Sequence, residues 1–141
     1  MAEPQMLEPG LRGQTEIVVA EQHTAPHVGS GHVRVLATPV MVNLMEAAAL
    51  QAVEGLLPAG SQTVGTHLDI THTAATPVGM RVRAYAELTA VNHRTLVFKV
   101  HAEDDKEPIG AGLHERIIIN LERFDLRMER KAGSVRGQRA R

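Results

Sequence analysis

The spacing of apolar and polar positions predicts one long helix in the first half of the chain. From Thr38 to Leu57 nearly every residue is apolar. A helix that is apolar on almost all sides is buried in a core. Thr38 is a good N-cap and Pro39 is well tolerated at the first helical position, so the helix should begin there. Pro58-Ala-Gly60 should end it.

After residue 60 the pattern changes to a period of two, which is typical of strands. Short turns are expected at 92–94 and 104–108, and short turns join antiparallel neighbours. One long helix against one antiparallel sheet gives an α+β domain, and a sheet wrapped around such a helix is the hot-dog fold. The strands are expected at 14–20, 64–72, 80–90, 96–102 and 109–121.

The first strand after the helix should carry the sheet's most informative side chains. Strict alternation would put one set of its residues on a single, core-facing side. The residues predicted to share that face are Val64, Thr66, Leu68, Ile70 and His72.

The sheet also leaves an edge open, so a homodimer or a higher homo-oligomer is expected.

Length and charge divide the chain into three parts. The 141 residues suit one domain. We assign residues 1–13 to a flexible lead-in, 14–126 to the domain and 127–141 to a basic tail. Seven Arg or Lys and two acidic residues lie from Arg123 onward, whereas the whole chain has a net charge of −1. Such a tail attracts phosphates, but without interleaved aromatic residues no nucleic-acid partner is expected.

Composition excludes several kinds of site. There is no cysteine, so disulfides, thiolate metal sites and a cysteine nucleophile are ruled out. The histidines offer no convincing metal spacing, and neither a metal nor a cofactor is expected. The N-terminus has no apolar signal region and no apolar run is long enough to span a bilayer. We therefore expect a cytoplasmic protein without a membrane partner.

Three polar residues stand in otherwise apolar segments. A hydroxyl, a carboxylate and an imidazole together suggest acyl transfer or hydrolysis, and burial would raise the pKa of Glu46 toward that of a useful base. Each residue also has a purely structural interpretation. Thr38 can be only an N-cap, and His72 a core histidine bonded to a backbone carbonyl. Glu46 can belong to a solvated helix stripe with Asn43 and Glu54.

Four short motifs carry a resemblance to a known family. They are Thr-x3-Val-x-Leu-Met-Glu at 38–46, Gly-Thr at 65–66, Thr-His-Thr-Ala-Ala-Thr-Pro at 71–77 and His-Glu-Arg at 114–116. In this order and at these separations, residues 36–125 resemble the fluoroacetyl-CoA thioesterase-like family of the hot-dog fold. The seven-residue motif at 71–77 is the most specific of the four.

The resemblance implies an acyl-CoA thioesterase. By that resemblance Thr38, Glu46 and His72 form the catalytic triad, with Glu46 as either base or nucleophile. Gly65 and Arg116 would lie near the thioester, although Arg116 can also be read as a surface salt-bridge residue. The site would lie between the helix start of one subunit and strands of the other. Coenzyme A enters only as part of the substrate.

One departure from the family affects specificity. The fluoroacetyl-specific enzyme has phenylalanines in a lid ahead of the helix, whereas residues 21–37 contain none. A small or short-chain acyl group is therefore expected, on coenzyme A or on a carrier protein. Two alternatives remain: a non-catalytic acyl-CoA-binding or regulatory domain, and an enoyl-thioester hydratase or dehydratase. The latter needs an Asp and a His positioned on the helix and its preceding loop, and the helix has neither.

Overall fold

The body of the protein is one five-stranded antiparallel sheet. The computed structural model describes residues 7–139. Neighbouring strands are hydrogen-bonded in the order β1-β3-β4-β5-β2, so β1 and β2 are the two edges. The strands are β1 (Arg12–Val18), β2 (Ser61–His72), β3 (Arg81–Asn92), β4 (Thr95–Asp104) and β5 (Pro108–Asn120).

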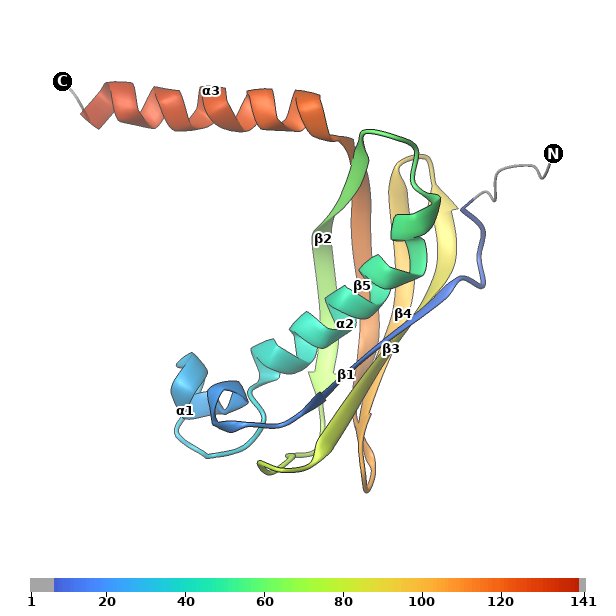
Figure 1. Ribbon diagram of the computed structural model, residues 1–141, viewed down its shortest axis with the longest axis vertical. Coiled ribbons are helices and arrows are strands. Elements are labelled where there is room, and N and C mark those ends of the chain that lie inside the picture. Colours follow the sequence, from blue (N-terminus) through green and yellow to red (C-terminus); the bar gives the residue numbers. More distant parts are fainter. Residues whose placement is uncertain (1–6, 140–141) are drawn as a thin grey trace.

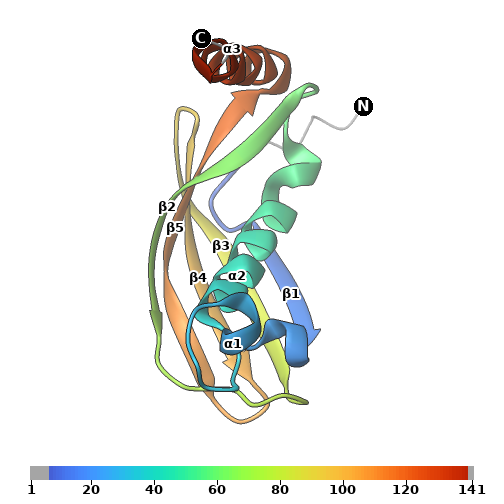
Figure 2. The same cartoon turned by 90° about the vertical axis from the view of Figure 1, so that its left-hand side faces the viewer.

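The sheet curves around one long helix, α2 (Thr38–Val53), which lies across its concave face (Figures 1 and 2). A 3-10 turn, η2 (Glu54–Leu56), continues the helix almost to its expected end. Met41, Met45 and Ala48 on α2 are fully buried, as is Phe98 on β4. The predicted α+β arrangement, an antiparallel sheet wrapped around a central helix, is confirmed.

Small residues allow β1 to cross α2 at very close range. A Cβ added to Gly13 would overlap the carbonyl oxygen of Ala48 and would lie 2.8 Å from the amide nitrogen of Ala52. Both alanines face the core. The alanine-rich helix therefore has a packing reason: larger side chains would hold the edge strand away.

A β-bulge in β2 corrects the predicted facing of that strand. Its register against β5 shifts between Gly65 and His67. Residues directly opposite each other in a sheet share a face. Val64 pairs with Ile117, whereas Leu68 pairs with His114, three residues away on an unbroken strand. Val64 therefore lies on the opposite face from Leu68, Ile70 and His72, because a bulge inserts one residue and reverses the alternation.

The segment between β1 and α2 forms two short helical turns, η1 (Glu21–His23) and α1 (Ala25–Val28). Backbone hydrogen bonds hold it in place. The amide of Ala25 donates to Val35 O at 2.9 Å, and the amide of Leu36 donates to Thr76 O at 2.8 Å. This segment, residues 21–37, covers the start of α2, and we call it the lid.

The predicted basic tail is largely helical. Helix α3 (Leu121–Arg139) begins directly after β5 and projects from the sheet (Figure 1). The side chain of Asn120 caps it by accepting a hydrogen bond from the amide of Arg123 at 3.0 Å. Its Arg, Lys, Glu, Leu and Met residues favour helix, which accounts for the helical form of the tail. No helix in the described part of the chain is both long and apolar enough to cross a membrane.

Candidate active site

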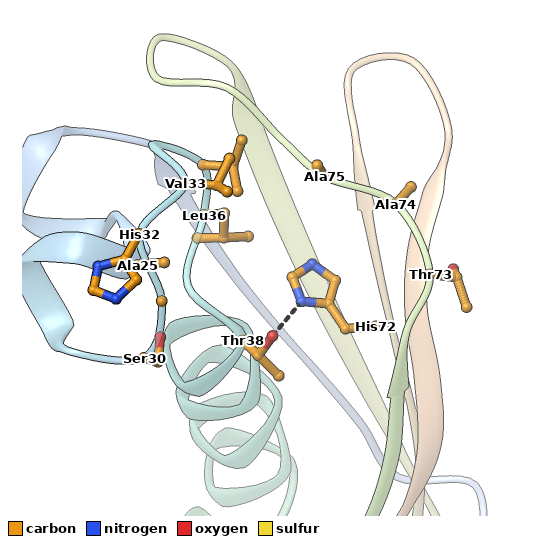
Figure 3. Close-up of a pocket in the computed structure, with 12 residues that line it drawn as sticks. Ala25, Ser30, His32, Val33, Leu36, Thr38, His72, Thr73, Ala74 and Ala75 are labelled. Carbon is orange, nitrogen blue, oxygen red and sulfur yellow. Dashed lines mark hydrogen bonds between the residues drawn. The ribbon is translucent and has the colours of Figure 1, made fainter.

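Thr38 and His72 meet at the N-terminus of α2. Thr38 is the first helical residue, and His72 is the last residue of β2. Thr38 Oγ1 lies 2.7 Å from His72 Nδ1 (Figure 3). The N-cap position belongs to Ala37, which makes no side-chain cap. The prediction that Thr38 caps the helix is therefore wrong by one residue, and its hydroxyl contacts the imidazole instead.

The imidazole of His72 is partly removed from water. Burial lowers its pKa below the ordinary value of 6.5, against a smaller opposite effect from the backbone of Ala74. Its Nε2 is buried and has no hydrogen-bond partner among the described residues. A neutral imidazole with one nitrogen on a hydroxyl and the other unpartnered is suited to moving a proton.

A cavity of about 370 Å³ opens beside this pair. Its walls come from the lid, including Val33 and Leu36, and from Ala74 and Ala75 just after β2 (Figure 3). These side chains are small or aliphatic, and His32 is the one lid residue with a ring among them. The cavity therefore has room and apolar surface for a small group next to the Thr38 hydroxyl.

Glu46 lies two turns further along α2, in a second group of residues. Its Oε2 is 3.7 Å from Arg116 Nη1. A Cβ added to Gly65 would lie 3.1 Å from the same carboxylate oxygen, so a larger residue there would crowd the Glu46 side chain. The Glu46 side chain is 36% exposed, less buried than the apolar helix led us to expect, while that of Arg116 is only 8% exposed.

Arg116 is a buried residue, so its interpretation as a surface salt-bridge residue is wrong. Its Nε donates to Thr63 Oγ1 at 2.9 Å, and its Nη2 donates to Thr63 O at 3.1 Å. Burial lowers its pKa, and the nearby charge of Glu46 opposes that effect. A buried guanidinium held in this way presents a fixed positive charge to the carboxylate.

His114 also belongs to this group, although no role was predicted for it. It is fully buried on β5, contacts Arg116 and the backbone of β2, and lies next to Gly65. One signal could have found it. Side chains two residues apart on a strand share a face, so His114 must accompany Arg116 on the side that faces Glu46.

The structure brings the predicted site residues together as two groups. Thr38 and His72 form one group, and Glu46, Gly65 and Arg116 form the other. Glu46 and Gly65 line a separate cavity of about 260 Å³. Eight residues of helix separate Thr38 from Glu46, about 12 Å along the axis. Among residues 7–139 no hydrogen bond or ion pair joins Glu46 to Thr38 or His72, and no cluster suited to a metal ion is found.

The chain matches the sequence profile of the fluoroacetyl-CoA-specific thioesterase family over residues 19–122. A fluoroacetyl-CoA thioesterase from Streptantibioticus cattleyicolor is 44% identical over 97 residues, which cover 69% of this chain and 70% of that protein.

Solved structures agree with this match. The fluoroacetyl-CoA thioesterase FlK is 37% identical with a TM-score of 0.85, over 90% of this chain and 98% of that one. A thioesterase-superfamily protein of Thermus thermophilus is 25% identical with a TM-score of 0.84, and the match covers 97% of this chain and 99% of that one. A hot-dog-like protein of Thermanaerovibrio acidaminovorans is 20% identical with a TM-score of 0.80, and the match covers 87% of this chain and 91% of that one. At this identity it supports the fold alone. The chain thus has the hot-dog fold and belongs to the fluoroacetyl-CoA-specific thioesterase family.

Proposed function

We propose that this thioesterase hydrolyses a small or short-chain acyl-CoA, with Thr38, Glu46 and His72 as its catalytic residues. The observation that carries the proposal is the 2.7 Å contact between Thr38 Oγ1 and His72 Nδ1 beside a cavity with small and aliphatic walls. Family membership supports the reaction class, and the absence of phenylalanine from the lid argues against specificity for the fluorinated substrate.

The start of α2 suits the charge that develops during hydrolysis. Water attack on a thioester carbonyl creates an oxyanion. The first turn of a helix has amides without intrahelical partners and a positive dipole end, and both stabilise negative charge. We assign Thr38 to orienting the carbonyl and His72 to carrying the proton. Glu46 acts as either the base for water or the nucleophile, with Gly65 and Arg116 near the thioester.

A second copy of the chain would complete the site. Among the strands of residues 7–139, β2 is hydrogen-bonded to β5 alone, and Leu68 in its middle is 42% exposed. Two β2 strands paired antiparallel about a two-fold axis near Leu68 would place the Gly65 level of one chain opposite the His72 level of the other. Glu46 of one subunit would then approach Thr38 and His72 of its partner.

Thiol release from a panel of acyl-CoAs, from acetyl to long-chain, tests the function. The wild type is compared with Glu46→Gln and His72→Ala, and with Glu54→Gln as the control because Glu54 is an exposed carboxylate just after the same helix. We expect turnover of short acyl-CoAs that both site variants abolish and the control retains. No turnover across the panel by a folded wild type would favour the non-catalytic acyl-CoA-binding alternative and overturn the proposal.

A further inference from the structure

His114 lies between the Glu46–Arg116 pair and the edge strand, and the mechanism above gives it no role. Its ring is completely buried. Both ring nitrogens have partners: Nδ1 lies 2.8 Å from the carbonyl oxygen of His67, and Nε2 lies 3.2 Å from Arg116 Nη1. This histidine therefore links the backbone of β2 to the guanidinium that faces Glu46.

The two partners determine where the proton of His114 resides. A carbonyl oxygen only accepts hydrogen bonds, so Nδ1 must carry a hydrogen and donate it to His67 O. A guanidinium only donates, so Nε2 must offer its lone pair to Arg116. The neutral Nδ1–H tautomer alone satisfies both contacts at once. A protonated ring would point an N–H at the guanidinium and break that contact.

The contact with His114 completes the restraint on Arg116. Two of its five N–H groups are taken by the hydroxyl and the carbonyl of Thr63, and a third is taken by His114 Nε2. Thr63 holds the Nε and Nη2 side of the guanidinium. Within residues 7–139, His114 is the one hydrogen-bond partner of Nη1, the nitrogen that lies 3.7 Å from Glu46 Oε2.

We propose that His114 is a positioning residue, whose neutral Nδ1–H tautomer fixes Arg116 Nη1 against Glu46. The proposal rests on the function proposed above for Glu46. The Phe98 ring stacks on His114 with the ring centroids 6.1 Å apart, and a Cβ added to Gly65 would lie only 3.2 Å from His114 Cε1, so the ring has little room on that side.

The electrostatic surroundings of His114 favour the same protonation state. Burial lowers the pKa of His114, and the positive charge of Arg116 lowers it further. The His67 carbonyl acts in the opposite direction, as do Glu46 and Glu115. The ring therefore stays neutral at neutral pH, which is the state that the proposal requires.

The first test reads the tautomer directly from the 15N signals of the histidine rings at neutral pH. We expect a protonated Nδ1 and an unprotonated Nε2 for His114. A ring protonated at Nε2, or at both nitrogens, would overturn the proposal. This measurement needs no substrate, so it tests the geometry even if the chain hydrolyses no acyl-CoA.

Two substitutions separate positioning from simple support of the fold. The side-chain amide of His114→Asn ends near the place of Nδ1 and can still donate to His67 O. That of His114→Gln reaches the place of Nε2 and can still accept from Arg116. Each keeps one of the two bonds. The same exchanges at His101, an exposed histidine on the other face of the sheet, provide the control.

We expect His114→Gln to keep kcat near the wild-type value. His114→Asn should lose up to about 100-fold in kcat with a smaller change in KM, because a displacement of about 1 Å is enough for such a loss. The 13C signal of the Glu46 carboxylate should shift in His114→Asn and stay unchanged in His114→Gln.

Equal losses in the two variants, or a better-preserved His114→Asn, would show that His114 only supports the fold and would overturn the proposal. The carboxylate signal decides between the variants without turnover. A wild type inactive on every acyl-CoA, with the carboxylate signals as expected, would contradict the proposed function and leave the positioning of Arg116 supported.

Discussion

Thr38 shows how one residue's role depends on a shift of a single position. As an N-cap, its hydroxyl would accept a hydrogen bond from a backbone amide of α2. At the first helical position it contacts His72 at 2.7 Å instead. The sequence identified the residue because Thr-Pro marks a helix start. It did not distinguish the N-cap position from the first helical position, because threonine is a favoured N-cap whereas Ala37 has no side chain that can cap the helix.

The partly buried His72 and the fully buried His114 predict how stability depends on pH. Burial lowers the pKa of both His72 and His114 below the ordinary value of 6.5. Between the folded pKa and 6.5, the unfolded chain therefore binds more protons than the folded one. Stability must rise with pH through this window and fall as the pH drops through it.

Denaturant unfolding between about pH 5 and 8 measures this dependence. We expect the free energy of unfolding to rise up to a pH just above 6.5 and then to level off. The free energy of unfolding of His72→Gln and of His114→Gln should each rise less steeply with pH than that of the wild type. A free energy that falls with increasing pH over this range would contradict the buried, neutral state of these rings.

At the scale of elements, the period change after residue 60 predicted the helix and the sheet because hydrophobic spacing follows burial. It did not predict the bulge between Gly65 and His67, which depends on the pairing of β2 with β5. Strict alternation along β2 would put Gly65 and His72 on opposite faces of the sheet, because they are an odd number of residues apart. The structure puts both on the face toward α2, since Gly65 pairs with Arg116 and His72 pairs with Gly110.

The crossing of β1 and α2 can be tested by adding one methyl group. Gly13→Ala should lower the free energy of unfolding by about 1–3 kcal/mol, because the new Cβ overlaps the backbone of Ala48. Gly55→Ala is the matched control: nothing lies within 4 Å of its added Cβ. Denaturant titration measures both. Equal stability of the two variants would mean that the helix and strand are not closely packed at Gly13.

At the scale of the whole molecule, the order of elements was predictable from the sequence, but the division of the site into two groups was not. Sequence spacing places Thr38 and Glu46 on one helix, about 12 Å apart along its axis, without showing which strand each would face. In the structure Thr38 faces the end of β2, and Glu46 faces Gly65 and Arg116. The proposed shared function of the two groups therefore rests on the proposal that a second copy of the chain completes the site.

Mixing two inactive variants tests this claim most directly. Glu46→Gln keeps His72, and His72→Ala keeps Glu46, so a mixed dimer has one complete site if the groups come from different subunits. Unfolded together and refolded, the two proteins should recover up to about one quarter of wild-type thiol release, because half of the dimers are mixed and each has one of two sites intact.

The two variants refolded separately should stay inactive, and a refolded mixture of His72→Ala with Glu46→Gln/His72→Ala is the matched control without any complete site. Recovered thiol release that appears only in the first mixture is the result that the proposed two-subunit site predicts. Absence of recovery, in mixtures shown by mass to contain mixed dimers, would contradict a site in which Glu46 of one subunit serves Thr38 and His72 of the other.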